Sequence, residues 1–155
     1  MSNRVWIYAS LTPFSDEVES SIHNELDLFL KEWKAHGITL SASSEILFHH
    51  LIVIKADEAE AMASGCSIDK QVQLMKELGK NYNLDFFNRL LIAYEKEGGF
   101  FIFPSAQTKS LLEKGDILAD TLVFDLSVST EEQFKNNFRI PLKDSWLSKY
   151  LNQLA

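Results

Sequence analysis

The sequence is poor in residues that crosslink a chain or break its regular structure. Its 155 residues include one cysteine, three prolines and six glycines. A single cysteine excludes an intrachain disulfide and supplies too few thiolates for a typical zinc site. The scarcity of proline and glycine argues against linkers and disordered tracts. We therefore predict a single domain over residues 1–155, in a reducing compartment.

Long apolar runs and clusters of basic residues are also missing. The longest apolar stretch, around Ile46–Ile54, is interrupted by His49 and His50 and falls short of the ~20 residues that cross a bilayer. No basic segment followed by an apolar one opens the chain, so we expect no signal peptide. The net charge is −7, and no run of lysine or arginine offsets it for a phosphate backbone. These absences predict an acidic, cytoplasmic protein with neither a nucleic-acid nor a membrane partner.

Apolar periodicity predicts two long helices. Ser15 or Asp16 can cap the first, which we expect over residues 16–35 with Gly37 stopping it. Its apolar residues recur every three or four positions and are Val18, Ile22, Leu26, Phe29 and Trp33. The second helix is expected over residues 67–81 on the same spacing. The acidic residues of these stretches indicate solvated helix faces.

Short apolar and β-branched runs predict the strands. Two segments, Val5–Ala9 and Ile46–Ile54, are apolar at odd- and even-numbered positions alike. Alternate positions of a strand point to opposite faces, so this pattern is typical of strands buried on both faces. Residues 38–43 alternate apolar and polar residues, as in a half-exposed strand. The Lys96–Gly99 segment predicts a hairpin turn. The remaining predicted elements are strands at 89–95, 100–103 and 122–124, and short helices at 107–113, 130–136 and 143–154.

The order of these elements indicates an α+β fold. The first half follows the sequence β-α-β-β-α-β, which is typical of a ferredoxin-like core with a mainly antiparallel sheet. A hairpin and short helices then form a C-terminal extension. In such a core we expect Val5–Ala9 and Ile46–Ile54 to be adjacent and central. The helices cover one sheet face, so the other face, which we expect to carry Trp6 and Tyr8, needs a cover from the last ~50 residues, a partner chain or a ligand.

A loop of small residues before the second helix is the first candidate site. It comprises Ser64, Gly65, Cys66, Ser67, Asp69 and Lys70. Free backbone amides at a helix start favour an anion or a thiolate, which would make Cys66 a reactive thiol. Alternatively, Ser64 or Ser67 caps the helix and Cys66 fills the core, and we expect this burial because free cysteines are mostly buried. The absence of a C-x-x-C pair excludes a dithiol mechanism.

Histidine and arginine supply the other candidates. His49 and His50 are adjacent in a predicted strand, so they point to opposite faces and cannot easily share a metal. Arg89 could bind a carboxylate or phosphate. Alternatively, Asp85 and Asn88 beside it satisfy backbone groups in a turn that leads into a strand. We expect no metal and no cofactor.

Four segments carry a resemblance that spans most of the chain. They are VWIYAS, ASGCSIDKQVQLMKELG, DFFNRLLIAY and KDSW. The chain resembles a family of small bacterial proteins found chiefly in Bacteroidetes, whose members often carry the automatic label "ABC transporter ATPase". The resemblance supplies no catalytic residue. A phosphate loop would need G-x-x-x-x-G-K-[ST], and the only Gly-Lys pair, Gly79-Lys80, is followed by Asn81 at the expected end of a helix. ATP hydrolysis is therefore not expected.

Two functions follow from these residues. The first is a non-enzymatic binding or protein-interaction module that uses an open sheet face with Trp6 and Tyr8, or a small pocket. Its partner would be a protein or a small molecule, and a homodimer is one possibility. The alternative is a thiol-dependent or small-anion-binding enzyme centred on Cys66 at the helix start.

Overall fold

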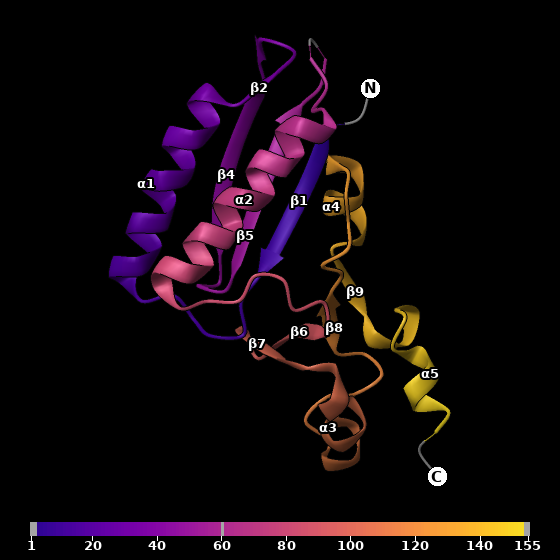
Figure 1. The fold of residues 1–155 in the computed structure, drawn as a ribbon. Coiled ribbons are helices and arrows are strands. Elements are labelled where there is room, and N and C mark those ends of the chain that lie inside the picture. The colour runs from indigo at the N-terminus through magenta and orange to yellow at the C-terminus, as the bar shows by residue number, and fades with distance from the viewer. Residues whose placement is uncertain (1–2, 60, 154–155) are drawn as a thin grey trace.

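The N-terminal half builds an antiparallel sheet of three strands. The computed structural model describes residues 3–59 and 61–153. Strands β1 (Arg4–Ala9), β4 (Ser41–Leu47) and β5 (Leu51–Asp57) lie in the order β1-β5-β4 (Figure 1). Residues 51–54 are all 0% exposed, as expected for a central strand with apolar residues at both parities. The predicted α+β class with antiparallel sheets is confirmed.

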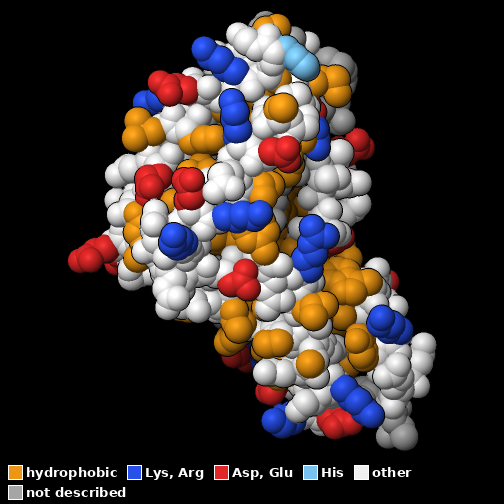
Figure 2. Space-filling view, viewed as in Figure 1, with side chains coloured by type: hydrophobic (Ala, Val, Ile, Leu, Met, Phe, Trp, Pro, Cys, Tyr) orange, Lys and Arg blue, Asp and Glu red, His pale blue; other side chains and the backbone are white. Residues whose placement is uncertain are grey.

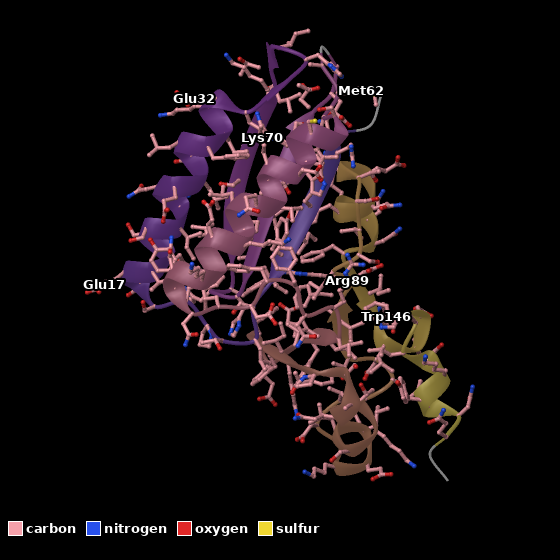
Figure 3. All side chains as sticks on the ribbon, viewed as in Figure 1. Glu17, Glu32, Met62, Lys70, Arg89 and Trp146 are labelled. Atoms are coloured by element: carbon pink, nitrogen blue, oxygen red, sulfur yellow. The ribbon has the colours of Figure 1, made fainter. Side chains whose placement is uncertain are left out.

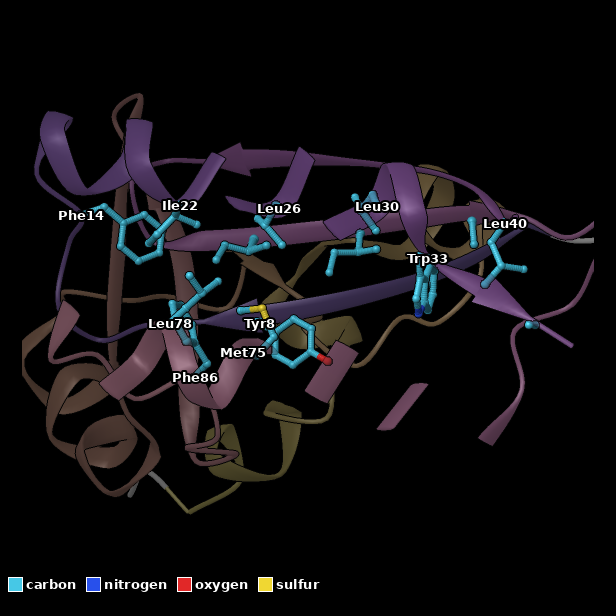
Figure 4. Close-up of a cluster of buried hydrophobic side chains, with 14 residues drawn as sticks. Tyr8, Phe14, Ile22, Leu26, Leu30, Trp33, Leu40, Met75, Leu78 and Phe86 are labelled. Atoms are coloured by element: carbon cyan, nitrogen blue, oxygen red, sulfur yellow. The ribbon is translucent and has the colours of Figure 1, made fainter. Parts of the chain in front are cut away.

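Two long helices cover one face of this sheet. They are α1 (Asp16–Glu32) and α2 (Gly65–Tyr82), and Figure 1 shows α2 in front of the strands and α1 beside it on the β4 side. Ser15 begins α1, because its side chain accepts a hydrogen bond from the Val18 N–H at 3.2 Å. Figure 4 shows the apolar side chains that fill the space between helices and sheet. This first core includes Ile22, Leu26, Leu30, Ile52, Ile54, Met75 and Leu78.

A short hairpin follows α1, and it corrects the predicted end of that helix. Strands β2 (Lys34–Ala35) and β3 (Ile38–Thr39) are joined by His36 and Gly37, whose φ angles are +53° and +79°. Gly37 therefore belongs to a tight turn, and α1 ends at Glu32 rather than at residue 35. The physical reason is Trp33, which adopts an extended backbone and directs its indole N–H to the Ser67 carbonyl at 2.7 Å.

The C-terminal half builds a second antiparallel sheet. Its strands are β6 (Leu91–Lys96), β7 (Gly99–Pro104), β8 (Leu122–Phe124) and β9 (Arg139–Pro141), in the order β7-β6-β8-β9. The predicted hairpin is confirmed, and its turn residues Glu97 and Gly98 both have positive φ, as a two-residue turn of type I′ requires. The predicted strand at 122–124 is also confirmed.

Short helices complete this half of the chain. The helical elements are η1 (Ser105–Gln107), α3 (Thr108–Lys114), α4 (Glu131–Asn137), η2 (Leu142–Asp144) and α5 (Ser148–Leu151). The predicted helices at 107–113 and 130–136 are confirmed within one residue at each end. The predicted helix at 143–154 is shorter than expected and is split between η2 and α5. None of the helices in the described residues is long and apolar enough to cross a membrane.

Two further cores hold the second sheet. One lies between the sheet and α3, η2 and α5, with Ile92, Val123 and Leu147 at its centre. The other joins the two sheets, because Ala9 and Leu51 of the first pack with Ala93 and Phe124 of the second. Phe48, in the turn between β4 and β5, stacks on Phe100 of β7 with a centroid distance of 4.7 Å.

The ferredoxin-like order predicted from the sequence is not confirmed. It requires a fourth strand beside β1, but β6 belongs to the second sheet. The edge of β1 is instead met by residues 129–130, and the Val5 N–H donates to the Ser129 carbonyl at 2.9 Å. The prediction that Val5–Ala9 is central is therefore wrong, although its pairing with the strand that contains residues 51–54 is confirmed.

The predicted strand Ile46–Ile54 is in fact parts of two strands. Phe48 and His49 have φ angles of +56° and +60°, and they form a tight turn between β4 and β5. The apolar run predicted one continuous strand because the turn also contains an apolar residue, Phe48. The side chain of Phe48 packs in the core between the two sheets. Because the turn is as apolar as the two strands beside it, the spacing of apolar residues does not distinguish the turn from the strands.

The prediction of an open sheet face with Trp6 and Tyr8 is also wrong. These residues point toward α1 and α2, and Tyr8 is only 9% exposed. Trp6 is half-buried, with its ring edge-on to Trp33 at 5.7 Å. The opposite face is the one that the last third of the chain partly covers, through residues such as Val128 and Phe134.

Candidate functional site

A cavity of about 310 Å³ lies where the two halves of the chain meet. Three segments form its walls: the chain that leaves β1, the chain that leaves α2, and the start of β6. The residues that line it are Ser10, Leu11, Thr12, Asn83, Leu84, Asp85, Asn88 and Leu91. The fold therefore brings together positions that are about 70 to 80 residues apart in the sequence.

The end of α2 shapes the first wall. Asn83 adopts the left-handed conformation (φ +55°) and its N–H donates to the Gly79 carbonyl. The Leu84 N–H donates to the same carbonyl at 2.8 Å. A Cβ atom at Gly79 would lie 2.6 Å from the Leu84 carbonyl oxygen, so only glycine allows the chain to fold back this closely. The Gly79-Lys80 pair thus lies in the last turn of a helix, as the sequence predicted, and not in a phosphate loop.

Two side-chain turns, at Asp85 and Asn88, form part of the cavity lining. The Phe87 N–H donates to Asp85 Oδ1 at 2.8 Å, and the Leu90 N–H donates to Asn88 Oδ1 at 2.9 Å. The alternative in which Asp85 and Asn88 satisfy backbone groups is therefore confirmed. Each turn occupies only one oxygen, which leaves a second carboxylate oxygen on Asp85 and the amide nitrogen on Asn88 for other partners.

The segment that leaves β1 is held by hydrogen bonds to the β4–β5 turn. The Ser10 N–H donates to the His50 carbonyl at 2.9 Å. The His50 Nδ1 lies 2.8 Å from the Ser10 carbonyl, and it must donate because a carbonyl oxygen only accepts. Ser10 as a residue is 1% exposed, and its hydroxyl donates to the Thr12 carbonyl at 2.6 Å. His50 therefore positions a cavity wall without lining the cavity itself.

The charge of the site is carried by one group. Asp85 is the only ionisable residue among the described residues that line the cavity. Arg89 lies near the junction of the two halves in Figure 3, but it is exposed and does not line the cavity. On the face in Figure 2, charged side chains of both signs are scattered over α1 and α2, so this face presents no basic field.

The loop before α2 forms a complete helix cap. The Ser67 N–H donates to Ser64 Oγ at 3.1 Å, and the Ser64 N–H donates to Ser67 Oγ at 2.7 Å. The capping alternative is therefore confirmed. The expectation that Cys66 is buried is wrong, because Ser67 takes the inward position (1% exposed) and leaves Cys66 exposed. Gly65, Asp69 and Lys70 are exposed as well.

The remaining candidates do not join this loop in one site. His49 is exposed, with its Nδ1 3.0 Å from Glu19 Oε1. His49 and His50 both lie at the β4–β5 turn rather than within a strand. Cys66 lies in the first turn of α2 and the cavity lies beyond its last turn, so roughly 24 Å of helix separates the two. Within residues 3–59 and 61–153, no group of three or more His, Cys, Asp or Glu side chains could hold a metal ion.

A buried polar pair under α2 was missed by the sequence interpretation. The Tyr8 hydroxyl donates to Gln71 Oε1 at 2.7 Å, and burial raises the pKa of Tyr8 to about 12. The Gln71 Nε2 is buried and has no hydrogen-bond partner among the described residues. A polar residue at an inward position of an amphipathic helix, here Gln71 one turn after Ser67, is the signal that could have indicated it.

The residues that line the cavity were also mostly missed. The sequence points only to Asp85 and Asn88, as neighbours of Arg89. Ser10 and Thr12 lie in an ordinary polar loop, and nothing in the sequence places that loop beside residue 83. In comparisons with known proteins, no protein-family model, no curated protein and no solved structure matches this chain.

Proposed function

We propose that the protein is a non-enzymatic binding module whose ligand occupies the cavity between the two halves of the chain. The observation that supports this is the cavity itself, a concave space of about 310 Å³ with polar groups on two segments that are far apart in the sequence. Its volume is at the lower end of the range for small-molecule sites, so the ligand has few non-hydrogen atoms. A cytoplasmic location and the resemblance to the Bacteroidetes family stay predictions from the sequence.

The chemistry of the lining favours a neutral polyol or a small amine. Asp85 brings a carboxylate, and among the described residues no lysine, arginine or histidine lines the cavity. An anion would therefore meet an uncompensated negative charge, whereas an ammonium or hydroxyl group can donate to the free carboxylate oxygen. The Asn88 amide and the Thr12 hydroxyl can bond further polar groups of the same ligand.

The exposed thiol of Cys66 supports a second candidate, a thiol-dependent function. It is the single cysteine of the chain, and it lies in the first turn of α2 beside free backbone amides. No histidine or carboxylate forms a hydrogen bond with it in the described structure, so a general base is missing. We therefore place this function second.

The experiment is a ligand screen with matched aspartate variants. Glycerol, sorbitol, ethanolamine and putrescine are added to the native protein, and binding is read as a rise in melting temperature and by native mass spectrometry. Asp85→Asn keeps the turn acceptor but removes the charge, so amine binding should weaken by about tenfold or more.

Asp57→Asn is the control, because Asp57 Oδ1 accepts from the Ala59 N–H in the same kind of turn, away from the cavity. It should leave binding unchanged. Equal loss of binding in both variants, or no binding of any probe together with no small molecule retained after purification, would contradict the proposal.

A further inference from the structure

The outer edge of β7 differs from the other sheet edges in its lack of charge. The two larger sheets end in β1 and β4, and in β7 and β9. β1 carries Arg4, β4 carries Glu45 and β9 carries Arg139. Charges on an edge strand oppose pairing with another chain. β7 consists of glycine, three phenylalanines, isoleucine and proline, and therefore has no such protection.

Hydrogen-bonded and non-hydrogen-bonded residue pairs alternate along the β6–β7 hairpin. This alternation determines which backbone groups of β7 face outward. The residue pair that flanks a two-residue turn is hydrogen-bonded, and every second pair repeats this pattern. The bond from the Ser105 N–H to the Leu90 carbonyl, at 2.6 Å, continues it. The N–H and C=O groups of Phe100 and Ile102 therefore point away from β6. None of these four groups has a hydrogen-bond partner in the described part of the chain.

We propose that β7 pairs antiparallel with β7 of a second copy of this chain, with Phe101 on the two-fold axis. In this register the Phe100 N–H donates to the Ile102 carbonyl of the second copy, and the Ile102 N–H donates to its Phe100 carbonyl. All outward groups of both residues are then hydrogen-bonded. A register with Ile102 on the axis would oppose Phe100 to Pro104, which has no N–H, and would leave the Phe100 carbonyl unpaired.

The side chains favour the same register. Phe101 is 45% exposed and stacks on Tyr94 with a centroid distance of 5.1 Å. On the axis it meets its own copy as a pair that is not hydrogen-bonded, where cross-strand side chains are closest. Because the strand has no ionisable residue, two chains of net charge −7 meet there without like charges opposite each other. Because the contact consists of one pair of six-residue strands, we expect a weak dimer that forms only at high protein concentration.

Sedimentation velocity over a concentration series that reaches about 300 µM tests the pairing. The native chain should self-associate. Phe101→Glu places two carboxylates against each other on the axis and should raise the dimer dissociation constant by about tenfold or more. Leu28→Glu, at a 66% exposed position on α1, is the matched control and should leave it unchanged. A native chain that stays monomeric, or a dimer that persists in the Phe101 variant, overturns the proposal.

A cross-link tests the register even if Phe101→Glu does not fold. Cys66→Ser removes the native thiol, and Phe101→Cys then supplies the single thiol of the chain. The Cα spacing of a pair that is not hydrogen-bonded lies within the range of a disulfide. Mild oxidation should give a covalent dimer, whereas Leu28→Cys in the same background should not. Cross-linking at Ile102→Cys in preference to Phe101→Cys would overturn the register.

Discussion

Tyr8 and Gln71 show how single polar residues fix the position of α2 over the first sheet. Their hydrogen bond of 2.7 Å crosses the core that separates a strand from a helix. The bond from Trp33 to the Ser67 carbonyl, also at 2.7 Å, does the same one turn earlier. Because buried polar groups are costly when unpaired, both bonds select one position of the helix over others with similar apolar contact.

Replacing Tyr8 by phenylalanine should therefore destabilise the protein by about 1–2 kcal/mol, because Gln71 loses its partner. The effect should depend on pH. The pKa of Tyr8 is raised from 10.0 to about 12 in the folded state, so ionisation above pH 10 favours the unfolded state. Stability should fall between pH 10 and 12 by at most about 1.4 kcal/mol per pH unit.

Urea unfolding of the native protein and the Tyr8→Phe variant at pH 8, 10 and 11 measures both effects. The variant should lose the part of the alkaline slope that Tyr8 contributes, while the raised pKa values of Tyr82 and Tyr94 affect both proteins alike. The same slope in both proteins would contradict the account of Tyr8.

Cys66 should react in the native state because its side chain is exposed. Iodoacetamide at neutral pH should add one label per chain without denaturant, since the sequence has a single cysteine. Mass spectrometry before and after addition of urea counts the labels. Labelling that begins only after unfolding would contradict the exposed position.

The end of α2 is the element that most directly shapes the cavity. Gly79 is buried, and the carbonyl of Leu84 occupies the space that a side chain would need. The left-handed residue Asn83 then turns the chain toward Asp85. A small residue near the end of a helix thus determines where the cavity wall lies.

Gly79→Ala should destabilise the protein by about 1–3 kcal/mol, since the new methyl group displaces the Leu84 backbone. It should also weaken any ligand bound in the cavity. Gly65→Ala is the control, because a Cβ atom there has no neighbour within 4 Å, and its effect should be within about 1 kcal/mol. Thermal unfolding of the two variants compares them, and equal stability would contradict the close contact at Gly79.

The elements could largely be predicted from the sequence, because they depend on local spacing. The helix faces around Ile22 and Met75 and the turn at Glu97-Gly98 are local signals. The end of α1 could not be predicted, since it depends on a contact between Trp33 and Ser67. The β4–β5 turn could not be predicted either, because its residue Phe48 is apolar like the strands beside it. The phenyl ring of Phe48 packs against Phe100 of the second sheet, a contact that the sequence does not show.

At the scale of the whole molecule, two sheets share an apolar core, and the cavity lies beside it. Which strand β6 joins is decided by its pairing with β7 and β8, and by the packing of Ala93 on Phe124. Local sequence patterns do not determine which strands pair, so they lead to the ferredoxin-like order, which the structure does not confirm. The cavity could not be predicted for the same reason, because its walls meet only after the two sheets have packed.

The measurement that tests the binding proposal most directly is an NMR titration of the labelled native protein with the probe that binds best in the screen. We expect the amide signals of residues 10–12 and 83–91 to shift together and to saturate, because these residues form the cavity walls. In Asp85→Asn the same signals should shift only at higher probe concentration. Shifts that cluster around Ser64–Lys70, or that are spread over the whole surface, would contradict the account.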